Sequence, residues 1–165
     1  MFVLGLDPSS TCTGWGVVEF TKGSFVDVEH GTIRPAGGTF ERRIQDLFTR
    51  LDIIFRSFSL HIDHVAAEAP VVFGHGRIGG RAASSQKVGV AYGACLAAAA
   101  ANGHHVVSYK PSEIKAAVCH HGAASKEHVA ISVRAILGLK KTPVHDAADA
   151  LAVAILHAGR RHAIR

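Results

Sequence analysis

An almost uninterrupted apolar segment, Phe2 to Leu6, constrains the fold of this chain more than any other feature of its sequence. The segment lacks the basic start and the length of a signal peptide. Its residues do not alternate between polar and apolar, which is typical of a strand buried on both faces. We therefore expect a central strand over residues 2–7, covered above and below, with Asp7 at its carboxyl end.

The rest of the chain shows patterns typical of strands and of amphipathic helices. Further strands are expected over residues 14–20, 25–33, 64–69 and 105–109. Helices are expected over residues 40–58, 84–101, 111–119 and 125–136, with a last one from about residue 145. Four glycines within residues 72–81 predict a mobile loop there. No repeat or low-complexity linker divides the 165 residues, so we expect one domain, an α/β or α+β layer fold around a mixed sheet.

Charge is unevenly distributed along the chain. Residues 1–68 carry nine acidic and six basic side chains, whereas residues 69–145 carry two acidic and nine basic ones. A basic half is expected of a surface that grips a polyanion, although a solvated basic face would have the same composition. The three cysteines are far apart, which indicates a reducing compartment such as the cytoplasm. We expect no membrane span, because the uncharged stretch between Lys87 and Lys110 contains Asn102 and two histidines.

Four acidic side chains stand where the predicted elements begin or end. Asp7 ends the first strand and Glu68 interrupts an apolar strand, while Asp146 and Asp149 lie three residues apart at the start of an apolar helix. Alone, each has an ordinary structural role as a turn former, an edge residue or a partner of the helix dipole. Together they need cations, and hard oxygen ligands select Mg²⁺ or Mn²⁺ over zinc. Two such ions about 4 Å apart can activate water and stabilise the leaving oxygen at phosphorus.

Several short motifs follow one another in an order that is itself informative. The first are Gly5-Leu6-Asp7-Pro8-Ser9-Ser10 with Thr13-Gly14-Trp15-Gly16-Val17, and then Ala67-Glu68. The middle ones are Lys87-Val88-Gly89 with Tyr92-Gly93, and Pro111-Ser112-Glu113-Ile114-Lys115. The last are Ala123-Ala124-Ser125-Lys126-Glu127 with Val129, and His145-Asp146-Ala147-Ala148-Asp149-Ala150-Leu151-Ala152. This ordered set, which spans nearly the whole chain, resembles the RuvC-type Holliday junction resolvases, or crossover junction endodeoxyribonucleases.

The resemblance implies an RNase H-like fold of the α/β class, with a five-stranded mixed sheet flanked by helices in a single domain over residues 1–165. It also implies a homodimer and Mg²⁺-dependent nicking of four-way DNA junctions, with two ions per active site and Mn²⁺ as a substitute. Asp7, Glu68, Asp146 and Asp149 match the metal-binding, catalytic carboxylates. Lys126 matches a lysine near the scissile phosphate, where it would offset developing negative charge as a further catalytic residue.

Further DNA contacts are expected from the basic half and from the glycine-rich loop. Phe73 is the nearest candidate for the aromatic residue that the family inserts at the junction, with Arg77 and Arg81 able to hold adjacent phosphates. The expected DNA-binding residues are Phe73, Arg77, Arg81, Lys87, Lys110, Lys115 and Lys126. A branch-migration helicase is a further expected partner.

The sequence departs from the family pattern in two places. Ser9 occupies a position where the family usually has glycine, and the loop from Pro70 to Ala83 is longer and richer in glycine. The first departure predicts a slightly different turn after Asp7. Both fit a viral or otherwise divergent branch of the family, working in a host or a bacterial cytoplasm.

Other interpretations compete with this one. The start Asp7-Pro8-Ser9-Ser10-Thr11 also resembles the phosphate-binding hairpin of actin-like ATPases and sugar kinases, but 165 residues leave no room for a second lobe. A nuclease of other branched DNA and a non-catalytic junction-binding protein stay open, although all four acids being present disfavours the latter. The twelve histidines include neighbouring pairs such as His104-His105, which lack zinc-ligand spacing. His145 is either a helix cap or a neighbour of the metal ions.

Overall fold

The structure, a computed structural model, describes residues 1–58, 61–70 and 80–163, with only the backbone given for residues 80–84. Within these residues five strands form one sheet in the order β3-β2-β1-β4-β5. Their bounds are β1 (Phe2–Asp7), β2 (Thr13–Thr21), β3 (Ser24–Ile33), β4 (His64–Glu68) and β5 (Val106–Tyr109). The first three strands form an antiparallel meander, whereas β1, β4 and β5 run parallel to one another. The predicted five-stranded mixed sheet is confirmed.

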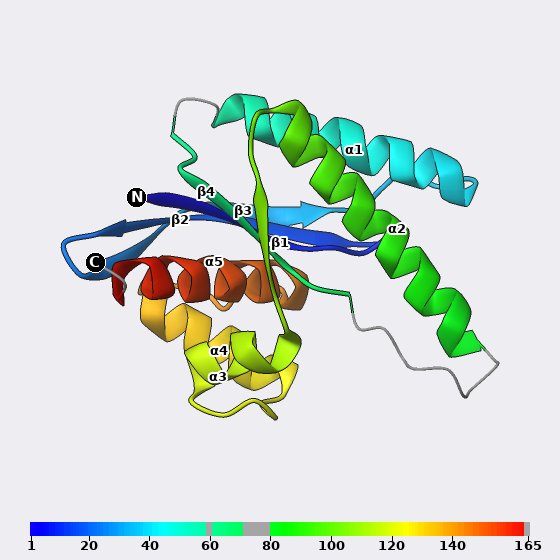
Figure 1. The fold of residues 1–165 in the computed structure, drawn as a ribbon. Helices are drawn as coiled ribbons and strands as arrows, with labels where there is room; N and C mark the ends of the chain where they lie inside the picture. The colour runs from blue at the N-terminus through cyan, green and yellow to red at the C-terminus, as the bar shows by residue number, and fades with distance from the viewer. Residues whose placement is uncertain (59–60, 71–79, 164–165) are drawn as a thin grey trace.

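Helices cover both faces of this sheet (Figure 1). On one face lie α1 (Phe40–Ser57) and α2 (Gly80–Ala101), and on the other lie α3 (Pro111–Cys119), α4 (Lys126–Leu137) and α5 (His145–Ala163). The central strand β1 contributes Leu4 and Leu6 to the core under α1 and α2, and Val3 to the core around α5. All three side chains are fully buried, which confirms the prediction of a strand covered on both faces.

Helix α2 begins earlier than the sequence predicts. Gly80 and Arg81 were expected in a glycine-rich loop and residues 82–83 before the helix, yet all four are helical. The alanine-rich segment that follows has a high helix propensity, which is enough to extend the helix backwards over one glycine. Residues 71–79, the rest of the predicted loop, lie outside the described residues.

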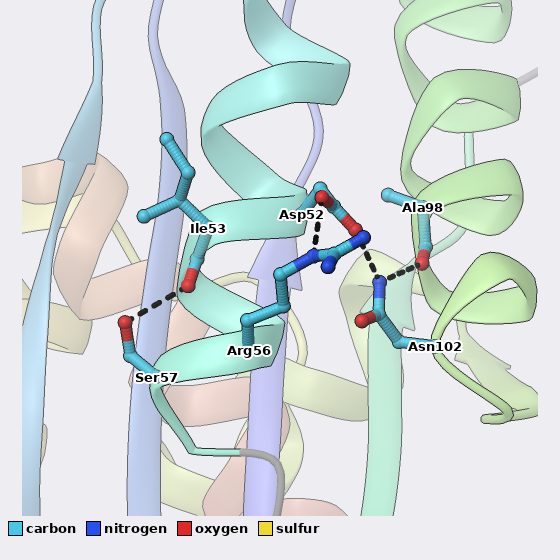
Figure 2. A network of polar contacts seen from close by, with 6 residues as sticks. All are labelled: Asp52, Ile53, Arg56, Ser57, Ala98 and Asn102. Atoms are coloured by element: carbon cyan, nitrogen blue, oxygen red, sulfur yellow. Dashed lines mark hydrogen bonds and ion pairs between the residues drawn. The ribbon is translucent and has the colours of Figure 1, made fainter.

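A polar network joins the ends of α1 and α2 (Figure 2). The side-chain amide of Asn102, just after α2, donates to Asp52 Oδ1 at 2.8 Å and to the Ala98 carbonyl oxygen at 2.9 Å. Arg56 Nε donates to the other oxygen of Asp52 at 2.7 Å. Because Asn102 bonds both helices, it fixes how α2 lies across α1 on this face of the sheet.

Helix α5 is buried on nearly all sides. A helix on the surface of a domain buries one side, but every residue of α5 from 150 to 158 is buried. The reason is that α5 packs on the sheet and is also covered by α3 and α4. Even His157 is buried, sharing a 2.9 Å hydrogen bond through Nδ1 with the hydroxyl of Tyr109 on β5. No described helix is long and apolar enough to cross a bilayer.

Candidate metal centre

Two of the four predicted acids, Asp7 and Glu68, are the last residues of neighbouring strands. The strands β1 and β4 pair in parallel, with Leu6 opposite Ala67. The next residues along the two strands are Asp7 and Glu68, so both carboxylates stand at one edge of the sheet, on strands about 5 Å apart. The buried apolar residues that precede them fix this register.

Glycines on β1 and β2 let the other two acids approach. A Cβ built on Gly14 would lie 1.8 Å from the carbonyl oxygen of Asp146, and one built on Gly5 would lie 2.1 Å from that of Ala150. Only a strand surface without side chains at these points can accept α5 so closely. The first turn of α5, with Asp146 and Asp149, therefore lies against the end of β1 that carries Asp7.

The electrostatic environment of Asp7 shows that the acids act on one another. The pKa of Asp7 is raised to about 8, mainly by burial and also by the charges of Glu68, Asp149 and Asp146, while Lys126 acts to lower it. A carboxyl group in this position resists ionisation unless a cation compensates it. The four acids predicted from sequence are thus brought within electrostatic range of one another.

The pKa values of Glu68 and Asp149 are also raised, and the charge of Lys126 acts to lower both. Burial raises the pKa of both carboxyl groups. The charge of Asp149 raises the pKa of Glu68 further, and the charge of Asp146 does the same for Asp149. Lys126 Nζ lies 3.1 Å from Asp149 Oδ2. Burial acts to lower the pKa of Lys126, but the charges of Asp149, Asp7 and Asp146 outweigh it and raise the pKa. Helix α4 positions this lysine, because Ser125 Oγ caps its start by accepting from the His128 amide at 3.2 Å.

The chemistry of these donors fits a hard divalent cation. Among the described residues, no group of three or more His, Cys, Asp or Glu side chains is placed so that it could hold a metal ion. Asp7, Glu68, Asp146 and Asp149 nevertheless act on one another electrostatically, and they offer oxygen ligands only. Such ligands suit Mg²⁺ or Mn²⁺, and a cation would offset both the burial and the neighbouring negative charges that raise the pKa of Asp7.

Side-chain hydroxyl groups shape the turn that follows Asp7. Ser9 Oγ accepts from the amide of Thr11 at 3.3 Å and from that of Cys12 at 3.5 Å. Thr13 Oγ1 donates to the Ser9 carbonyl oxygen at 2.6 Å and accepts from the Ser9 amide at 3.0 Å. These bonds join Ser9 to Thr11, Cys12 and Thr13, the first residue of β2, and so fix the turn that follows Asp7.

Cys12 is a neighbour of the site that sequence reasoning missed. Burial raises the pKa of its thiol, as does a hydrogen bond to the side chain of Asp146, while Arg34 and a hydrogen bond with Thr32 act to lower it. One signal for this contact is present in the sequence: Cys12 is two residues from Gly14, so both face α5. The sequence alone does not show that α5 packs closely on Gly14, so this spacing could not be interpreted before the structure was known.

The predicted DNA-binding residues are placed at different distances from the acids. Lys115 on α3 lies close enough to Glu68 to act against the increase in its pKa. Lys110 is exposed at the start of α3, directly after Tyr109, which pairs with Glu68. Lys87 is exposed on α2. Phe73 and Arg77 lie outside the described residues, as does the side chain of Arg81.

His145 begins α5 and is exposed. Burial raises the pKa of Asp149, and the charge of His145 acts to lower it, so the two side chains lie within electrostatic range. The helix cap itself is formed by the preceding residue, because the amide of Ala148 donates to the Val144 carbonyl oxygen at 2.9 Å. The role of His145 as a neighbour of the metal ions stays a prediction.

A mixed five-stranded sheet with helices on both faces, and with acids at the ends of its two central parallel strands, defines an RNase H-like fold. The family described as crossover junction endodeoxyribonuclease RuvC matches residues 3–157, and the chain belongs to this family. The protein of that name from Nitratidesulfovibrio vulgaris is 40% identical over 163 residues, which cover 99% of this chain and 93% of the relative. The relative from Pseudomonas entomophila is 38% identical over 98% of this chain and 88% of its own length.

Solved structures agree with this assignment. Thermus thermophilus RuvC in complex with a Holliday junction substrate matches with a TM-score of 0.85 and 32% identity, covering 99% of this chain and 96% of that one. Members of this family are hydrolytic nucleases that depend on a divalent metal ion. The predicted fold, family and class of enzyme are therefore confirmed.

Proposed function

We propose that this protein resolves four-way DNA junctions by nicking them, with Asp7, Glu68, Asp146 and Asp149 holding two Mg²⁺ ions. The observation that carries this proposal is the convergence of four carboxylates from three separate parts of the chain, with Lys126 beside them. It is supported by membership of a family in which a Thermus relative was solved with a Holliday junction substrate. Mn²⁺ would substitute, because the ligand chemistry is the same.

The residues of this chain would divide the work of hydrolysis between them. Bound ions would supply an activated water and stabilise charge on the leaving oxygen. Asp7 and Glu68, held by strands, provide the rigid part of the site, and the first turn of α5 adds Asp146 and Asp149. Lys126 would place its ammonium group against the reacting phosphate, where negative charge increases in the transition state.

A comparison of DNA substrates tests this proposal. We expect Mg²⁺-dependent paired nicks in a synthetic four-way junction and far slower cutting of linear duplex, flap and bubble substrates of the same sequence. Equal cutting of flaps or bubbles would favour the alternative, a nuclease of other branched DNA. Tight junction binding without nicks at any Mg²⁺ concentration would favour the non-catalytic junction-binding protein.

Replacing Lys126 with alanine should slow nicking more than it weakens DNA binding. We expect a loss of about 10²-fold in the single-turnover rate, as for removal of one donor that stabilises the transition state. The affinity for metal-free junction DNA should fall much less. Lys110→Ala is the control, because this exposed lysine just before α3 should alter only the salt dependence of binding, by about one counterion. Equal losses of rate and affinity in Lys126→Ala would contradict a catalytic role.

Paired cutting requires two sites, and we propose that α2 forms the interface of a homodimer. Its inner side packs against α1 through residues such as Ala91 and Cys95, whereas Val90 and Gly93 on its outer side are exposed. A Cβ built on Gly93 would meet no atom within 4 Å, so a second helix could approach closely.

Sedimentation of the DNA-free protein tests the dimer. The wild type should sediment as a dimer and Val90→Glu as a monomer, because a carboxylate would be buried without a partner. Ala135→Glu, at an exposed position of α4, should stay dimeric. A monomeric wild type, with or without DNA, would exclude paired cutting by this route.

The remaining expectations of the sequence are kept as proposals. We propose that residues 1–165 work as one RNase H-like nuclease domain in the cytoplasm, where free Cys12, Cys95 and Cys119 would stay reduced. Lys87, Lys110 and Lys115, together with Phe73, Arg77 and Arg81, are proposed to contact DNA. A branch-migration helicase remains the proposed protein partner.

A further inference from the structure

We propose that Arg34 is a positioning residue that holds a phosphate of the DNA strand next to the reacting one, on the β3 side of the acids. The proposal rests on the proposed nuclease function and adds a residue that the sequence analysis did not consider. Three observations carry it: the place of Arg34 in the sheet, the absence of a described partner for its charge, and the distribution of cations around the acidic cluster.

Strand register places Arg34 beside the acids. In the antiparallel pair of β2 and β3, Gly14 lies opposite Thr32 and Thr13 lies opposite Ile33. Continuing this register by one residue brings Arg34 opposite Cys12, and residues opposite each other in an antiparallel pair point to the same face. That face is the one occupied by α5, because a Cβ on Gly14 would meet Asp146. Arg34 therefore lies at the end of the sheet where the acids gather, just beyond the first turn of α5.

The charge of Arg34 is available for a ligand. Its side chain is exposed, and within residues 1–58, 61–70 and 80–163 it makes no ion pair or hydrogen bond. By contrast, Arg50, Arg56 and Arg160 each bond a carboxylate at 2.7–3.1 Å. The Cys12 thiol hydrogen-bonds to the side chain of Asp146, and the charge of Arg34 also acts on this thiol. Arg34 thus stays close to the negative cluster without being neutralised by it.

Cations lie around the acidic cluster in the described part of the chain. Lys126 on α4 and Lys115 on α3 act on Glu68, whereas Arg34 follows directly after β3. Two strand spacings, about 10 Å, separate β3 from β1, the strand that ends at Asp7. At that distance Arg34 would contact a neighbouring phosphate and not the one under attack. Its planar guanidinium suits this role because it can bind two phosphate oxygens at once.

The test measures binding of a synthetic four-way junction in EDTA at several salt concentrations. Arg34→Ala should weaken binding about tenfold at 0.1 M salt, as for the loss of one charged hydrogen-bonded contact. The slope of log affinity against log salt concentration should decrease by about 0.9, the value for one phosphate. With saturating DNA and Mg²⁺, single-turnover nicking should change less than twofold, which separates a positioning residue from Lys126.

Two further variants make the outcome decisive. Arg34→Gln keeps most of the side-chain volume and should show the same changes in affinity and slope, so a folding defect specific to alanine is recognised. Arg134→Ala removes another exposed arginine, on α4, and should leave affinity and slope close to those of the wild type. Wild-type affinity and slope in both Arg34 variants would overturn the proposal. A wild-type protein that neither binds nor nicks the junction would overturn the proposed function instead.

Discussion

Replacing Asp7 with asparagine is expected to lower the rate of junction nicking by about three orders of magnitude or more. The amide keeps the shape of the side chain but removes the charge of a ligand shared by the proposed ions. Stabilisation of transition-state charge by a bound metal amounts to several kcal/mol, and each 1.4 kcal/mol corresponds to a factor of ten in rate. Affinity for metal-free junction DNA should persist or increase, because repulsion between Asp7 and the phosphates is relieved. Normal nicking by Asp7→Asn in Mg²⁺ would exclude the proposed site.

The same variant should be more stable than the wild type when no metal is present. The pKa of Asp7 is raised from 3.8 to about 8, mainly by burial, so the folded protein holds a proton that the unfolded chain releases. Metal-free stability should therefore decrease as pH rises from about 4 to 8, and asparagine should remove this contribution. Thermal unfolding in EDTA at pH 5 and pH 8 measures the difference. Glu29→Gln, an exposed acid on β3, should keep the pH dependence of the wild type.

Replacing Gly14 with alanine should be the most disruptive single methyl addition in the site. The new Cβ would lie 1.8 Å from the Asp146 carbonyl oxygen, so backbone must move. Such overpacking costs about 3 kcal/mol, which corresponds to a decrease in Tm of about 10 °C for a chain of this length. Because the atom displaced belongs to Asp146, the nicking rate should also fall at a temperature where the variant is folded. Differential scanning calorimetry and single-turnover cleavage measure the two effects.

A second glycine provides the control for this experiment. Gly159 lies within α5, and a Cβ there would meet only the Phe25 ring, at 3.8 Å. Gly159→Ala should stabilise the protein by about 0.5–1 kcal/mol, because alanine is the better helix former. If Gly14→Ala retained both Tm and rate, α5 would not need this close contact to position its acids.

Sequence reasoning predicted correctly those parts of the molecule that depend on a local pattern of residues. The double burial of β1 follows from its apolar composition, and α3 begins at Pro111 as expected for a residue suited to a first helical turn. Glu68 was recognised as a candidate site residue because a charged side chain in a short apolar strand needs a partner or a metal ion. The family resemblance then joined the four acids, which lie up to 142 residues apart in the chain.

The features that sequence reasoning missed depend on contacts between distant segments. Cys12 and Arg34 gain their meaning only when α5 packs on Gly14, more than 130 residues from Asp146 in sequence. His157 was considered only as one of many histidines, yet it bonds Tyr109 inside the core. The helical start of α2 at Gly80 was missed for a different reason, since local glycine content outweighed the propensity of the alanines that follow.

The antiparallel course of α5 along β1 has a practical consequence for handling the protein. From the acids, β1 leads back about 17 Å to Phe2, and α5 leads about 24 Å to His162. The two segments end together: the amino group of Met1 donates to the Phe20 carbonyl oxygen at 3.1 Å, and the Phe20 ring contacts that of His162. Figure 1 shows both ends on the same side. A dye or a surface tether attached there would leave the DNA-facing edge uncovered, so single molecules could be watched while they cut.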